Sequence, residues 1–147
     1  MFRKSRNNYL LGLTMFACGI ISGGMIQLAS VAEAQSGERV FELRTYTTHP
    51  GRLDALHARF TNHTTGLFER HGMTNIGYFV PQDAPLEENT LIYVLAHDSR
   101  EAGKASWAAF NADPEWQAAY HASISDGPIV QKIENIYMDT TDYSMIK

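Results

Sequence analysis

Hydrophobic and polar residues alternate over residues 40–46 (Val-Phe-Glu-Leu-Arg-Thr-Tyr), and this period of two is typical of a β-strand. From Arg52 the period changes to that of a helix. We expect this helix to end at His71-Gly72, because glycine readily takes the left-handed cap conformation. The apolar side of the predicted helix carries Leu53, Leu56, Phe60, Thr64, Leu67 and Phe68.

Three more strands and a second helical region follow. Strands are predicted over residues 76–80, 90–97 and 129–138. The second helix is expected to begin at a capping box formed by Asp98 and Glu101 and to end near residue 110. A short helix should then start at Pro114, with Asp113 as its N-cap.

The order strand, helix, strand, strand, helix, strand predicts an α+β, ferredoxin-like βαββαβ fold, in which a four-stranded antiparallel sheet carries its helices on one face. The bare face would cover roughly 400 Å², about the largest apolar patch that a soluble monomer tolerates. We expect this face to include Tyr78, Tyr93 and Leu95. A second copy of the chain would cover it, which predicts a homodimer through the sheet face, with a pocket between sheet and helices or at the dimer seam.

The N-terminal segment has a different pattern. A basic start (residues 3–6) precedes an apolar run over residues 9–28, and the small-residue motif at 32–34 (Ala-Glu-Ala) follows. This order predicts a signal peptide over residues 1–34 and a periplasmic or secreted protein. The alternative is a retained anchor, since residues 9–28 are long enough to span a bilayer; a membrane partner is expected only in that case.

Composition narrows the chemistry further. The chain has 147 residues, a net charge of −4 and one cysteine. The acidic balance argues against a nucleic-acid partner, and a single cysteine excludes a disulfide framework within one chain. The six histidines offer no pair four residues apart on one helix, so neither a metal site nor a cofactor is expected. Motifs typical of serine hydrolases and P-loop enzymes are missing from the sequence.

Glu42, Arg44 and Tyr46 are the candidate functional residues of the first strand, because alternation places them on one side of it. One interpretation is a structural Glu–Arg ion pair at a barrel rim or dimer seam. The other is that Arg44 binds a carboxylate or enolate while Tyr46 donates a hydrogen bond. His97, at the end of the third strand, could serve as a general base, or it could simply be a polar strand end beside Asp98.

Four segments resemble motifs of the NIPSNAP family, and together they span a domain over residues 39–142, with residues 143–147 as a C-terminal tail. The segments are Phe41–Tyr46, Pro50–Asp54, Glu69–Met73 and Ala112–Trp116. The resemblance implies a dimeric α/β-barrel of paired ferredoxin-like units, a superfamily that includes cofactor-free monooxygenases and haem-binding enzymes. Tyr93-Val94-Leu95 departs from the His-x-Trp pair common in relatives, so no histidine role transfers to position 93.

These observations predict an exported, dimeric module of undetermined activity that binds a small hydrophobic molecule or a protein partner. The alternative is a small cofactor-free monooxygenase-like enzyme acting on a hydrophobic compound, with Arg44, Tyr46 and His97 as its catalytic candidates. The space between sheet and helices separates the two hypotheses. An open cavity lined by the three candidates would favour an enzyme, whereas a filled space would favour a non-catalytic module. The residues expected to fill that space are Phe41, Leu43, Phe60, Leu67 and Phe110.

Overall fold

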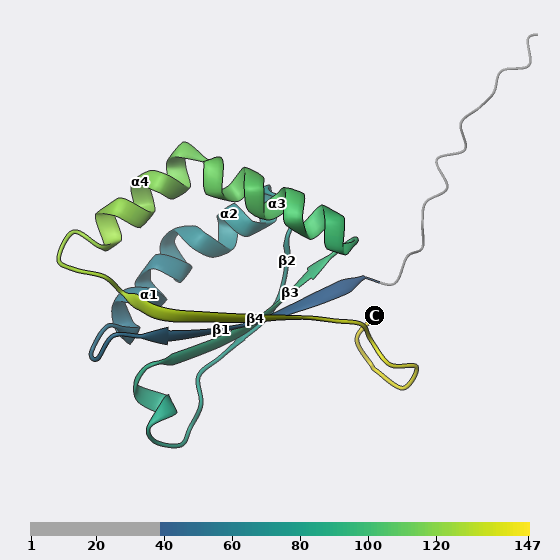
Figure 1. The fold of residues 1–147 in the computed structure, drawn as a ribbon, viewed down its shortest axis with the longest axis horizontal. Coiled ribbons are helices and arrows are strands. Elements are labelled where there is room, and N and C mark those ends of the chain that lie inside the picture. Colours follow the sequence, from purple (N-terminus) through teal and green to yellow (C-terminus); the bar gives the residue numbers. More distant parts are fainter. Residues whose placement is uncertain (1–38) are drawn as a thin grey trace, which may run out of the picture. The chain divides into compact units, whose positions relative to one another are not determined.

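The computed structural model describes residues 39–147 (Figure 1). The predicted signal peptide therefore lies outside the described residues. In chain order the elements are β1 (Val40–Thr48), α1 (Leu53–Arg59), the π-helical turn η1 (Phe60–Thr64), α2 (Thr65–Arg70), β2 (Thr74–Phe79), the 3₁₀ turn η2 (Leu86–Glu88), β3 (Thr90–His97), α3 (Arg100–Ala112), α4 (Pro114–Ser123) and β4 (Val130–Met138). No helix among these is long and apolar enough to cross a membrane.

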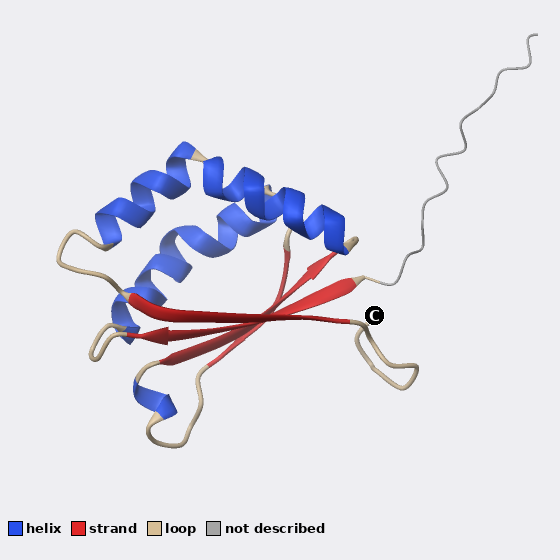
Figure 2. Cartoon of the chain, viewed as in Figure 1, coloured by secondary structure: helices blue, strands red, loops and turns tan. Residues whose placement is uncertain are grey.

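The four strands form one sheet in the order β2-β3-β1-β4, and every neighbouring pair is antiparallel. All the long helices lie against one face of this sheet, as Figure 2 shows. The predicted α+β, ferredoxin-like arrangement is confirmed. The hydrophobic core lies between that face and the helices, and its buried cluster is drawn from residues 46–129. We therefore expect residues 35–147 to fold on their own.

The first helical region forms as its apolar stripe predicts, with one irregularity. Leu56, Phe60, Thr64 and Phe68 are all buried against the sheet. Between α1 and α2 the chain widens into the π-helical turn η1, where the Thr64 hydroxyl donates to the Arg59 carbonyl at 3.2 Å. The region ends before Gly72, whose φ of 75° is the expected left-handed conformation.

The start of the second helical region differs from the prediction. Ser99, not Asp98, is the N-cap of α3, and its hydroxyl accepts a hydrogen bond from the Ala102 backbone N–H at 3.0 Å. Ser99 is extended, as an N-cap must be, whereas Asp98 belongs to the bend that leaves β3. The cap of α4 is confirmed, since the Asp113 carboxylate accepts from the Glu115 backbone N–H at 2.7 Å.

The residues that we predicted for the bare sheet face lie on the opposite face, so this prediction was wrong. Tyr93 and Leu95 are 0% exposed and lie in the core beneath the helices, where Tyr78 stacks on Tyr93. The register explains this, because Arg44 of β1 pairs with Tyr93 and both side chains therefore point to the helix side. Alternation separates the two faces of a strand but does not say which face the helices cover. Here the polar face of β1 is the covered one.

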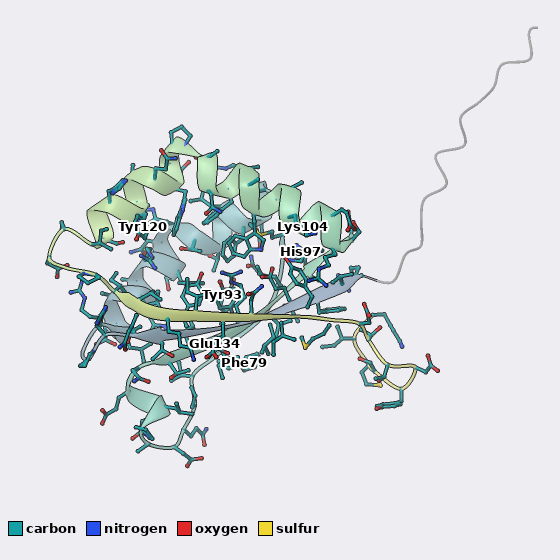
Figure 3. The ribbon with its side chains drawn as sticks, in the orientation of Figure 1. Phe79, Tyr93, His97, Lys104, Tyr120 and Glu134 are labelled. Carbon is teal, nitrogen blue, oxygen red and sulfur yellow. The ribbon has the colours of Figure 1, made fainter. Side chains whose placement is uncertain are left out.

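The opposite face of the sheet is bare of helices and apolar at its centre. It carries Leu43 of β1 with Val94 and Ile92 of β3, together with Phe79 and Ile136, which are each 58% exposed. Figure 3 shows Phe79 and Glu134 on this side of the sheet and Tyr93 on the other. An exposed apolar patch therefore exists on this face, as expected, although different residues form it.

Candidate functional site

A cavity of about 750 Å³ lies between the helices and the covered face of the sheet. Its wall combines aromatic rings with polar and charged side chains. The aromatic lining residues are Tyr46, Phe60, Phe68, Trp107, Phe110, Trp116 and Tyr120, and the cationic ones are Arg44, Arg59 and Lys132. A concave space of this size, lined by aromatic rings and by polar groups, has the character of a small-molecule site.

A buried carboxylate supports the cavity from behind. Glu42 is 0% exposed, and its Oε1 accepts hydrogen bonds from Arg44 at 2.7 Å and from Asn135 at 3.2 Å. Its Oε2 accepts from the Trp107 indole at 2.7 Å and from His97 Nε2 at 3.0 Å. One side chain of β1 thus ties together β3, β4 and α3, and all its acceptor sites are used.

These four donors keep the Glu42 carboxyl ionised. Burial alone would raise the pKa of this group, but the hydrogen bonds from His97, Trp107 and Arg44 outweigh burial and lower the pKa from 4.5 to about 2. The Glu42–Arg44 ion pair that we expected is therefore present. It lies inside the protomer, beside the cavity wall.

Arg44 and Tyr46, two of the predicted site residues, both line the cavity. The Arg44 guanidinium lies over the Trp107 ring, 4.2 Å from its centroid, and its charge is matched by Glu42. Tyr46 packs edge-on against Phe60 and Tyr93. Arg44 is thus a fixed part of the wall, and Glu42 already neutralises its charge.

His97, the third predicted site residue, is placed differently. It is 2% exposed and does not line the cavity; the Glu42 carboxylate separates it from that space. Its ring lies directly against the backbone of α3 at Gly103, where an added Cβ would be 2.9 Å from the ring Cγ. Because the ionised Glu42 can only accept, His97 Nε2 carries the proton of their hydrogen bond.

The close approach of His97 to Gly103 reverses the usual effect of a glycine-to-alanine change in a helix. We expect Gly103→Ala to destabilise the fold by about 1–3 kcal/mol, because the new methyl group overpacks a ring that the Glu42 hydrogen bond holds in place. Gly66 of α2 is the matched control, since its Cβ would meet open space. Gly66→Ala should stabilise by roughly 0.5–1 kcal/mol. Urea unfolding measures both, and a stabilising Gly103→Ala would contradict this packing.

Arg59 is a residue of the cavity wall that the sequence did not single out. It ends α1, is 5% exposed and forms no ion pair with any described residue. Its Nη1 donates to the Ser123 hydroxyl at 3.2 Å, and its guanidinium lies 5.5 Å from the Trp116 ring centroid and 5.4 Å from that of Tyr120. Its place on the buried stripe, three residues after Leu56, was the signal that could have identified it.

Comparison with known families decides what this domain is. The NIPSNAP family model matches residues 41–145, most of the chain. The chain belongs to the NIPSNAP family. The family match names no activity, and no curated protein matches the sequence.

Solved structures agree with the family assignment at the level of the fold. A NIPSNAP family protein of unknown function from Agrobacterium tumefaciens is 23% identical, with 75% of this chain and 95% of that chain covered at a TM-score of 0.65. A NIPSNAP-like domain protein from Burkholderia xenovorans is 21% identical, with coverages of 73% and 89% and a TM-score of 0.64. A Nitrosomonas europaea protein named among the antibiotic biosynthesis monooxygenases is 11% identical, with coverages of 74% and 95% and a TM-score of 0.50.

Two of the NIPSNAP motifs touch each other in the structure. They are the segments Glu69–Met73 and Ala112–Trp116. Arg70 donates to the Glu115 carboxylate at 2.6 Å, and the His71 ring forms a hydrogen bond with the Asp113 carboxylate at 2.7 Å. Asp113 also caps α4, so this cluster fixes the helix that carries Trp116 into the cavity wall. The hydrogen bond from His71 is the largest of the effects that lower the pKa of Asp113. These motif residues therefore position the cavity wall without lining the cavity themselves.

In the described part of the chain, no group of three or more His, Cys, Asp or Glu side chains is arranged to hold a metal ion. The expectation of a site without metal stays a prediction for the whole chain.

Proposed function

We propose that this protein is an exported, dimeric binding module that holds a small hydrophobic molecule in the cavity between its sheet and its helices. The observation that carries the proposal is the open, aromatic cavity of about 750 Å³. Phe41 and Leu43, which could have filled this space, belong to the opposite face of β1. The helix side of the wall is instead rich in large rings, and Tyr46 adds one from the sheet, a surface that suits a flat aromatic ligand.

Binding without chemistry is favoured over the monooxygenase-like alternative by the place of His97. Oxidation of a bound compound without a cofactor needs a proton acceptor beside it. Arg44 and Tyr46 are at the wall, but His97 lies behind Glu42, with its Nε2 proton committed to that carboxylate. The likeness to a protein named among the monooxygenases concerns the fold, which hosts many functions.

The dimer in this proposal is formed by the bare sheet faces of two copies. The apolar centre of that face, around Leu43, Val94 and Ile136, would be removed from water by an identical face. Export is proposed from the leader over residues 1–34. N-terminal sequencing of the exported chain should begin at Gln35; a chain that keeps residues 9–28 would be membrane-anchored instead.

The binding proposal predicts saturable uptake of a neutral aromatic probe. N-phenyl-1-naphthylamine, which becomes fluorescent in apolar surroundings, should bind residues 35–147 with micromolar affinity. Ile133→Trp should weaken this binding roughly tenfold or more, about 1.4 kcal/mol, because Ile133 lines the cavity while being half exposed, so a larger ring can fill the space from the rim.

Ile136→Trp is the matched control, with the same change three residues later on β4 but on the bare face. It should leave the affinity for the probe unchanged. Probe binding that is absent in the unsubstituted protein, or that survives Ile133→Trp and is lost in Ile136→Trp, would contradict a ligand site in this cavity.

A further inference from the structure

The Arg59 guanidinium is the most unusual charge in the described residues. The residue is only 5% exposed, yet no carboxylate of the described residues pairs with it. Its Nε lacks a hydrogen-bond partner, and its one side-chain partner is the neutral hydroxyl of Ser123. A buried, unpaired cation is costly, and an arginine cannot lose its proton to avoid that cost.

The other charges of the cavity are already balanced. Arg44 is paired with Glu42, and the Lys132 ammonium lies 2.8 Å from the Glu134 carboxylate. The described lining residues include no aspartate or glutamate. The wall therefore carries one uncompensated positive charge, that of Arg59, which also lines the cavity.

We propose that the ligand of this cavity is an aromatic monocarboxylate and that its carboxylate pairs with Arg59. This inference rests on the proposed binding function and adds the chemical class of the ligand. One carboxylate cancels one guanidinium and fits its fork of donors, whereas the second negative charge of a dianion would have no counter-charge in the wall. The aromatic body follows from the rings that surround the cavity, above all Trp107, Trp116 and Tyr120.

The surroundings of Arg59 support a role in binding over a role in stability. Burial lowers the pKa of Arg59, which reflects the cost of keeping its charge out of water. The rings of Trp116 and Tyr120 offset part of this cost through cation–π contacts and hold the guanidinium beside the cavity. A ligand carboxylate would supply the missing partner.

The test compares three probes that share one ring system: 2-naphthoate, the neutral 2-naphthamide and the dianionic 2-naphthyl phosphate. Isothermal titration of residues 35–147 at pH 8 should give an affinity for 2-naphthoate at least tenfold higher than for either of the others. Arg59→Met should reduce the naphthoate-to-amide ratio to about one while leaving amide binding in place. Arg59→Lys, which keeps the charge, should keep part of the preference.

Two further measurements separate binding from a structural role. Arg59→Met should raise the midpoint of thermal unfolding of the unliganded protein, because an apolar side chain of similar length replaces an unpaired buried charge. Arg100→Met removes the same charge from an exposed position outside the cavity and should leave the preference for naphthoate unchanged.

The outcomes are distinct for the two proposals. Equal affinities for naphthoate and naphthamide, a preference that persists in Arg59→Met, or tighter binding of the phosphate would overturn the monocarboxylate proposal and leave the binding function standing. Failure of naphthoate, naphthamide and N-phenyl-1-naphthylamine to bind would overturn both.

Discussion

Glu42→Ala should lower the free energy of unfolding by about 3–5 kcal/mol at pH 7. The substitution leaves the Arg44 guanidinium largely buried without its counter-charge. It also removes the acceptor of the Trp107 indole, of His97 Nε2 and of the Asn135 amide, so that, with Arg44, four donors from four elements lose their partner together. Urea unfolding followed by tryptophan fluorescence measures the change, and a loss below about 1 kcal/mol would contradict the role given to this carboxylate.

The same residue should give the fold a characteristic acid sensitivity. The pKa of Glu42 is about 2 in the folded state against 4.5 ordinarily, so the folded state favours the ionised form. The resulting stability, about 3 kcal/mol, is fully present above roughly pH 5 and is lost progressively as the pH falls towards 2. Glu42→Gln should remove this part of the pH dependence.

A matched control for the pH experiment is Glu134→Gln. Glu134 is exposed and pairs only with Lys132, so its replacement should change stability by less than about 0.5 kcal/mol at any pH. Unfolding curves at pH 7 and pH 3 compare the three proteins. If Glu42→Gln loses as much stability between these pH values as the unsubstituted protein, Glu42 is not the group responsible.

Ile136→Lys should convert the proposed dimer into a monomer. Ile136 is 58% exposed in the single chain, so a lysine there costs the protomer little. In a dimer of bare sheet faces the same ammonium would be buried against apolar side chains without a partner, at a cost of several kcal/mol. The dissociation constant should therefore rise by roughly a thousandfold or more, which corresponds to about 4 kcal/mol.

Sedimentation equilibrium of residues 35–147 at micromolar concentration measures this change directly. Ile133→Lys, the same substitution on the same strand but on the cavity side, should leave the dimer intact. An unsubstituted protein that sediments as a monomer, or dissociation caused equally by both lysines, would contradict the sheet-face dimer.

The order of elements could be predicted from the sequence because local periodicity and capping residues decide it. The strand over residues 90–97 and the Asp113 cap are confirmed as predicted. The helices differ from expectation near their ends and at the π-helical turn η1. The face of the sheet that the helices cover could not be predicted in this way. Glu42 and Arg44 are tolerated in the interior only because partners distant in sequence, Trp107 and His97 among them, satisfy them.

The site was predictable where one strand supplies it and unpredictable where several elements converge. Arg44 and Tyr46 lie on one strand, and both reach the cavity. His97 bonds the Glu42 carboxylate, but its ring packs against α3 at Gly103 and does not reach the cavity. This position depends on the register of β1 and β3 and on the small size of Gly103. Arg59 lies within the first predicted helix, where a charged side chain is ordinarily exposed. In the structure α4 packs over it through Ser123, Trp116 and Tyr120.

The central claim, that the cavity between sheet and helices is a ligand site, is tested most directly by the chain's two tryptophans. Trp107 and Trp116 are the only tryptophans in the sequence, and both line the cavity. In ¹H–¹⁵N correlation spectra of residues 35–147, both indole resonances should shift saturably as 2-naphthoate is added, while the amides of Leu43, Ile92 and Val94 stay in place. If the indole resonances stay in place while the resonances of those sheet amides shift, the result contradicts a ligand site in this cavity.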